Sequence, residues 1–245
     1  MQPSSPNAQA RIAALDGLRG VAAAIVVVFH YLCLLHWEVT PYYTQDPPAL
    51  SDTPVALLWN GPFAVIVFFA LSGFVIAAAA ERRRARLLSN AVTRYLRLAI
   101  PVAVSVLLAW LWLTLLPNAA EELRAATPDS SGWLRYTYQG EIPGPLLALL
   151  DGLAGNFVQG GSSFNNVLWT MQVELLGSLM LFAIYWLAEG RRRLWLLAAT
   201  GCAILLFFAR GYIFFGKGYL AFITGALLYE AYKADLLGRM PRWSG

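Results

Sequence analysis

The feature of this sequence that most limits its fold is a series of apolar runs, each about as long as a membrane is thick. A helix needs roughly 20 mostly apolar residues to cross about 30 Å of hydrocarbon, because each residue adds about 1.5 Å. Six runs approach this length, at residues 17–36, 60–80, 98–116, 167–188, 194–210 and 218–233. They predict an all-α fold, a polytopic transmembrane helical bundle of about six spans.

The composition agrees with a membrane protein and excludes a soluble enzyme. Hydrophobic residues make up 58% of the 245 residues and charged residues only 13%, whereas about a quarter of the residues in soluble domains are charged. A chain of this length cannot enclose so many apolar side chains, so most of them must face lipid. The net charge of +4 does not indicate a nucleic-acid partner, because the arginines come in short runs between apolar segments. Two histidines and two distant cysteines form no metal motif.

The positions of the basic residues predict the topology in the bilayer. Cytoplasmic loops collect Lys and Arg, and most of the 18 basic residues fall on one side if the N-terminus and the C-terminus are both cytoplasmic. An integral protein of the cell membrane is therefore expected. The residues placed on the cytoplasmic side are Arg11, Arg19, Arg82, Arg83, Arg84, Arg86, Arg94, Arg97, Arg191, Arg192, Arg193, Lys233, Arg239 and Arg242.

Two outer loops, at residues 37–59 and 117–166, separate the predicted spans. Four prolines lie in the first loop, so we expect it to be irregular and partly extended. The second loop contains a short apolar piece over 146–158, interrupted by Asp151. This piece is too short to span, so we expect an interfacial or re-entrant helix there.

Ionisable residues within the first span need either a partner or a function, because placing each one at mid-membrane costs at least roughly 2.5 kcal/mol of free energy. Arg19 and His30 are eleven residues apart, which places them within about 20° on one helix face and about 16 Å apart along it. A donor from the cytoplasm could be held at Arg19 and react at His30. Alternatively, Arg19 extends to the interface and His30 bonds within the bundle. Asp16 either caps this helix or pairs with Arg19.

Glu174 is the costly residue of the fourth span. A carboxylate there must be neutral, paired or next to water, and His30 is a natural partner for it. Such a pair would fix the imidazole tautomer and raise its basicity, as a general base requires. The alternative is an interhelical hydrogen bond that only holds the bundle together.

Two further segments have mainly structural interpretations. Ser72 and Gly73 allow close approach of helix backbones, which explains them better than a nucleophilic serine does. The basic stretch over 82–97 would suit anionic lipid heads or a polyphosphate ligand. The positive-inside rule, however, accounts for a basic loop by itself.

Four motifs in order resemble those of acyltransferase family 3, the integral-membrane O-acyltransferases. The first is similar to the family's opening motif, the second to two aromatics followed by Leu-Ser-Gly-Phe, the third to a basic segment ending in proline, and the fourth to Trp-Ser/Thr-x-x-x-Glu. In the same order, these four motifs lie at Leu15–Gly20 with His30, at Phe68–Phe74, at Arg94–Pro101 and at Trp169–Glu174.

This resemblance implies transfer of an acyl group, commonly acetyl, to a hydroxyl of a carbohydrate or glycosylated acceptor. The implied donor is acyl-CoA, which enters as a substrate, and no tightly bound cofactor is expected. His30 is then the catalytic histidine, either as a general base or as an acyl carrier, and Arg19 belongs to the donor-handling motif with Asp16.

The other motif residues receive roles in the same way. Arg94 and Arg97 are candidates for binding the CoA phosphates, while Glu174 and Trp169 belong to the core of the same site. Ser72 lies in the second-helix motif beside it.

The family usually has about ten membrane helices, so the shorter series here suggests a C-terminally short member. Residues 1–245 are then a single domain that corresponds to the N-terminal part of the usual one. One alternative to an active enzyme is an inactive fragment or pseudoenzyme that needs further helices. The other is a proton-coupled transporter that uses Arg19, His30 and Glu174 as its path, although the sequence lacks the internal repeat common in transporters.

Overall fold

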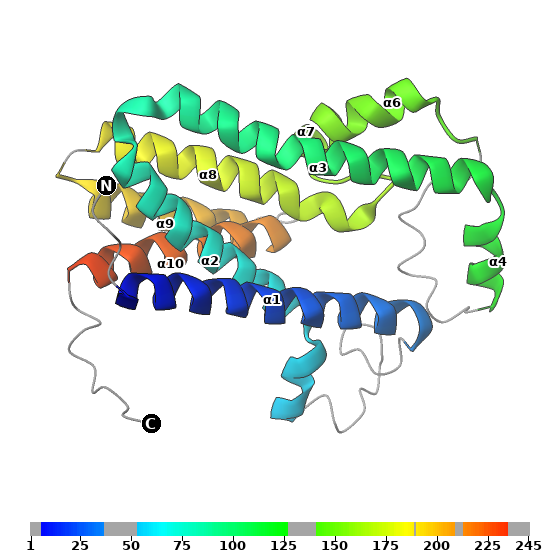
Figure 1. Cartoon of the computed structure of the whole chain (residues 1–245), viewed down its shortest axis with the longest axis horizontal. Helices are drawn as coiled ribbons and strands as arrows, with labels where there is room; N and C mark the ends of the chain where they lie inside the picture. Colours follow the sequence, from blue (N-terminus) through cyan, green and yellow to red (C-terminus); the bar gives the residue numbers. More distant parts are fainter. Residues whose placement is uncertain (1–5, 37–52, 127–140, 189, 209–212, 235–245) are drawn as a thin grey trace. The chain divides into compact units, whose positions relative to one another are not determined.

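The computed structural model describes residues 6–36, 53–126, 141–188, 190–208 and 213–234, and all of their regular structure is helical (Figure 1). The longer helices are α1 (Pro6–Leu35), α2 (Gly61–Arg82), α3 (Leu87–Leu115), α8 (Thr170–Leu187), α9 (Arg192–Phe208) and α10 (Ile213–Lys233). The shorter ones are η3 (Pro54–Trp59), η4 (Arg84–Arg86), α4 (Ala119–Ala126), α6 (Pro145–Leu150), η6 (Asp151–Gly155), α7 (Asn156–Gln159) and η7 (Asn166–Trp169).

Four helical segments of the described chain are long and apolar enough to cross a membrane. They are Ala14–Leu35, Gly61–Arg82, Arg84–Leu115 and Asn166–Leu187, and they coincide with the first four predicted spans. The other two predicted spans fall on α9 and α10. The 17 residues of α9 make about 25 Å of helix, and α10 carries charged residues within it. The count of about six spans therefore stays a prediction.

The chain forms two compact units. The first comprises residues 1–68 and 116–137, and the second residues 69–115 and 138–245. In the first unit, the buried ring of Phe29 on α1 lies against Gly61, where a Cβ would clash with the ring. In the second unit, α3 lies beside α8 and α9 lies beside α10 (Figure 1).

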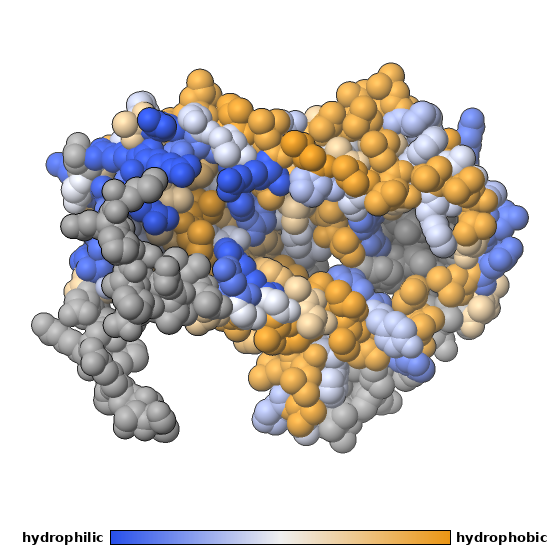
Figure 2. Space-filling view, viewed as in Figure 1, coloured by the Kyte–Doolittle hydropathy of each residue, from blue (hydrophilic) through white to orange (hydrophobic). Residues whose placement is uncertain are grey.

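Helix α3 has one face in the core of the second unit and one apolar face exposed. Its buried side chains pack with later residues of the chain. Exposed apolar side chains recur along the rest of its surface, as expected of a helix that faces lipid. Figure 2 shows hydrophobic residues along the outer side of this helix. The core residues are Ala99, Val102, Val106, Ala148, Phe157, Phe164, Leu168 and Leu175. The exposed residues are Leu88, Val92, Leu96, Ile100, Val104 and Leu108.

Glycines bring α2 and α10 into close backbone contact. A Cβ on Gly73 would clash with the carbonyl oxygen of Phe222, and a Cβ on Gly225 would clash with the carbonyl of Ala70. The close backbone approach predicted here is therefore confirmed at Gly73.

Helix α3 begins earlier than predicted. Its first residue is Leu87 rather than residue 98, so Arg94 and Arg97 are helical and Pro101 lies inside the helix. The prediction began the helix where the apolar run begins, but arginine and leucine are good helix formers on both sides of that point. A proline removes only one backbone hydrogen bond and is tolerated inside membrane helices.

The predicted outer loops are more helical than expected where the structure describes them. Residues 54–59 form the 3-10 helix η3 instead of an extended segment, because Pro54 at its start has a helical φ; residues 37–52 lie outside the described part. The apolar piece over 146–158 is a helix, as predicted. It runs from α6 through a π-helical turn, η6, into α7. Its interfacial or re-entrant location stays a prediction.

Candidate active site

Glu174 joins three helices of the second unit. Its side chain is buried within α8. Oε1 accepts a 2.6 Å hydrogen bond from Oγ of Ser72 on α2, and Oε2 forms an ion pair with Nη2 of Arg94 on α3. The carboxylate thus has both a hydrogen-bond donor and a compensating charge, the two conditions under which a buried charge is tolerated.

Arg94 reaches α8 at two points one helical turn apart. Besides its ion pair with Glu174, its Nε donates to Oγ of Ser178 at 3.0 Å. Ser178 in turn donates to the backbone carbonyl of Glu174 at 2.6 Å. The planar guanidinium fits this arrangement better than a lysine would. These contacts turn Arg94 into the bundle, while Arg97, three residues later, is exposed.

Trp169 lies immediately before α8, among aromatic side chains of the same unit. Its ring meets Phe69 of α2 edge-on, with the centroids 6.3 Å apart, and meets Phe215 of α10 in the same manner at 6.2 Å. Edge-to-face packing of this kind fixes ring orientation. Two separate helices, α2 and α10, therefore hold the aromatic residue of the fourth motif.

Polar side chains fasten the short helices to the start of α8. Gln172 donates to the backbone carbonyls of Phe157 and Val158 at 3.0 and 2.9 Å, which satisfies acceptors at the end of α7. Asp151 accepts from Ser162 at 2.5 Å. None of these contacts was predicted from the sequence. The positions of Gln172, Asp151 and Ser162 close to apolar runs did indicate that these side chains needed partners.

His30 and Arg19 belong to the first unit. The half-buried ring of His30 lies 5.5 Å from that of Phe29 and hydrogen-bonds to the backbone of Val26, one turn earlier. Asp16 Oδ1 lies 3.5 Å from Nη1 of Arg19. Asp16 therefore pairs with Arg19 and does not cap the helix, which begins at Pro6. The pairing of His30 with Glu174 stays a prediction.

A second, partly buried polar cluster of the second unit was missed by the sequence analysis. The carboxylate of Glu81, near the end of α2, accepts hydrogen bonds from Arg192 at 2.5 Å, Lys233 at 2.5 Å and Tyr229 at 2.7 Å. Burial alone would lower the pKa of Arg192, but Glu81 outweighs that effect, so the pKa of Arg192 lies above its ordinary value. The only sign of this cluster in the sequence was that a single acidic residue, Glu81, directly precedes a run of arginines.

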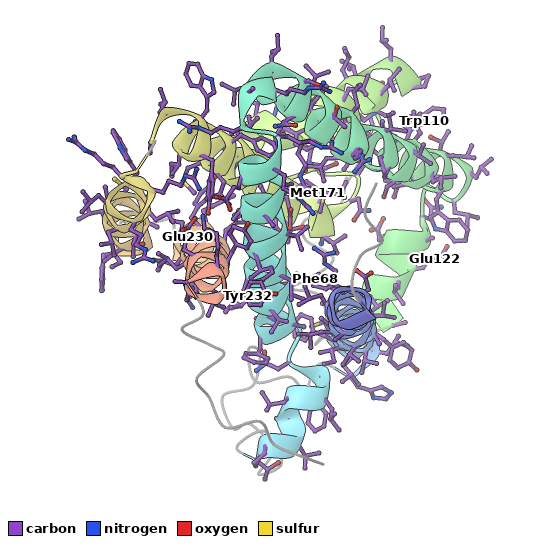
Figure 3. The ribbon with its side chains drawn as sticks, turned by 60° about the vertical axis from the view of Figure 1, so that its left-hand side comes forward. Phe68, Trp110, Glu122, Met171, Glu230 and Tyr232 are labelled. Atoms are coloured by element: carbon purple, nitrogen blue, oxygen red, sulfur yellow. The ribbon has the colours of Figure 1, made fainter. Side chains whose placement is uncertain are left out.

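Glu230 extends this cluster along α10 (Figure 3). It accepts a 2.7 Å hydrogen bond from the fully buried Tyr185 of α8, and Nζ of Lys233 lies 4.0 Å from its carboxylate. Arg192 stacks over the Tyr185 ring at 5.0 Å. The cluster thus joins the ends of α2, α9 and α10 to α8.

Comparison with known proteins decides the family. The model of the acyltransferase domain of this family matches residues 12–245, which is nearly the whole chain. The chain belongs to acyltransferase family 3. No curated protein and no solved structure matches it.

Membership in acyltransferase family 3, together with the four candidate spanning helices, supports a membrane acyltransferase in general. Among the described residues of this family 3 chain, no group of three or more His, Cys, Asp or Glu side chains is placed to hold a metal ion.

Proposed function

We propose that this family 3 protein transfers an acetyl group from acyl-CoA to a hydroxyl of a carbohydrate or glycosylated acceptor. The observation that supports this proposal best is that Ser72 and Arg94 both contact the buried carboxylate of Glu174. Each of these residues comes from a different motif, and the motifs are separated by up to 102 positions. A fold that only needed stable helices would not require an ionised group at this point.

The proposed chemistry uses His30 as a general base. A ring N–H that donates to the backbone of Val26 fixes the imidazole tautomer, and the other ring nitrogen is the proton acceptor in this proposal. His30 takes the proton of the acceptor hydroxyl while the hydroxyl oxygen attacks the thioester carbonyl carbon. A C–O bond forms and the C–S bond breaks. The proton then passes from His30 to the thiolate, which leaves as free CoA.

The remaining residues position the reactants in this proposal. Arg97 is exposed on α3 and binds a phosphate of CoA, for which a guanidinium is well suited. Arg19 guides the donor toward His30 along the first helix. Arg94, the other residue predicted to bind the CoA phosphates, is ion-paired with Glu174 and is a positioning residue in this proposal. The predicted pairing of Glu174 with His30 would orient the imidazole.

The test is transfer of labelled acetyl from acetyl-CoA in membranes that contain the whole chain or its His30→Ala variant. We expect label in a carbohydrate fraction with the wild type only, at equal amounts of inserted protein. Equal transfer by both proteins would remove His30 from the mechanism.

If neither protein transfers label, binding of CoA to the purified chain separates the remaining alternatives. Bound CoA without transfer points to a missing acceptor. No CoA binding contradicts the proposal and favours the inactive fragment, and proton flux in liposomes without CoA binding favours the transporter.

A further inference from the structure

Contacts within the second unit bring two distant basic segments to the same end of that unit. Glu81 on α2 bonds to Arg192 at the start of α9 and to Lys233 at the end of α10. Nη2 of Arg84 donates to the backbone carbonyl of Trp186 near the end of α8, at 3.2 Å. Residues 82–86 and 191–193 therefore lie near each other, and hydrophilic residues gather around the α2–α3 junction in Figure 2.

Among the residues that the structure describes, most of the positive charge at this end has no carboxylate partner. Arg192, Lys233 and Arg84 are engaged by Glu81 and by a backbone carbonyl. The other arginines are all exposed, and within the described part of the chain none of them pairs with a carboxylate. We call these residues the arginine rim: Arg82, Arg83, Arg86, Arg191 and Arg193.

The side chains beside the arginine rim are those of a membrane interface. Trp186 and Trp195 are 48% and 52% exposed, and they stand next to the exposed Leu187 and Leu194. Exposed tryptophans concentrate where the headgroups meet the hydrocarbon, because the indole ring has an apolar body and one polar N–H. Guanidinium groups a few residues away are then at the depth of the lipid phosphates.

We propose that the arginine rim binds the phosphate of an anionic phospholipid headgroup. Guanidinium groups bind phosphate oxygens through paired hydrogen bonds, and the neighbouring tryptophans and leucines contact the upper acyl chains. This site is separate from the residues proposed for acyl transfer, because the arginine rim includes none of Arg19, Arg94 and Arg97.

The test measures lipid retained by the whole chain purified in a neutral detergent, by native mass spectrometry after addition of phosphatidylglycerol or phosphatidylcholine. We expect retention of phosphatidylglycerol and little retention of phosphatidylcholine. The double variant Arg191→Gln/Arg193→Gln should weaken phosphatidylglycerol retention by about tenfold or more. Lys217→Gln is the control, because it removes an exposed charge at the other end of α10.

Two further measurements, a double variant that keeps the charge and a salt series, make the outcome decisive. Arg191→Lys/Arg193→Lys keeps the charge and should retain more lipid than the Gln pair, and higher salt should weaken retention by the wild type. If the Gln pair does not fold, the Lys pair and the salt series carry the test. Equal retention of the two lipids, or retention that salt and both variants leave unchanged, would overturn the proposal. Displacement of the lipid by CoA would instead assign the arginine rim to the donor, also against the proposal.

Discussion

Arg94 on α3 and Glu174 on α8 form an ion pair inside the second unit, although they are 80 positions apart in the sequence. Oγ of Ser72 donates a hydrogen bond to the same carboxylate. The pair connects two of the helices that are able to span a membrane. Stability and the proposed chemistry therefore depend on the same contact.

Breaking this ion pair from one side should cost more stability than removing both charges. Arg94→Gln or Glu174→Gln leaves a buried charge uncompensated, which typically costs about 3–5 kcal/mol. The double variant Arg94→Gln/Glu174→Gln should recover part of that loss. Thermal unfolding of the three variants in detergent measures the coupling, and additive losses would show that the two side chains do not interact.

Ser72→Ala should destabilise the bundle and lower acetyl transfer without abolishing membrane insertion. It removes one hydrogen bond to a charged group, an interaction worth about 1.5–3 kcal/mol. Ser89→Ala is the matched control, since Ser89 is exposed on α3. Unfolding temperatures that fall equally for both variants would argue against a specific role for Ser72.

Gly73→Ala should be strongly destabilising, because a Cβ at this position would clash with the carbonyl oxygen of Phe222. Gly20→Ala is the contrasting variant, since nothing lies within 4 Å of a Cβ built there. Alanine is favoured over glycine inside a helix by about 1 kcal/mol, so Gly20→Ala should keep or raise the unfolding temperature. Similar behaviour of the two variants would contradict the close contact of α2 with α10.

Tyr185→Phe should loosen α10 from α8. The hydroxyl is the donor to the buried Glu230 at 2.7 Å, and an unsatisfied buried acceptor costs about 1–3 kcal/mol, or more if it is charged. Tyr31→Phe, at a site 55% exposed, should change little. Limited proteolysis of residues 190–234 and unfolding temperature together report this effect, and equal protection in both variants would count against it.

Arg97→Gln should raise the KM for acetyl-CoA by about tenfold, the effect of losing one charge-assisted contact of about 1.5 kcal/mol. The exposed side chain predicts that the unfolding temperature stays close to that of the wild type. Arg97→Lys should restore part of the affinity. An unchanged KM with reduced stability would instead give Arg97 a structural role.

The sequence by itself determined the helical class, the first four spanning segments and the family resemblance. Length and apolar content are local properties, because the hydrocarbon thickness sets how many consecutive apolar residues a span needs. The start of α3 was placed wrongly because Arg94 and Arg97 suit both a basic loop and a helix. The position of Glu174 within an apolar run indicated that it required a partner, but it did not indicate which residue that partner is.

The tertiary structure decided which partners meet. Ser72 and Arg94 meet Glu174, Asp16 pairs with Arg19 instead of capping its helix, and Glu81 gathers the ends of α2, α9 and α10. Hydropathy measures the cost of placing a residue in lipid but carries no information on which helix face lies opposite. That choice depends on the packing of whole helices, such as the close contact that Gly73 and Gly225 allow between α2 and α10.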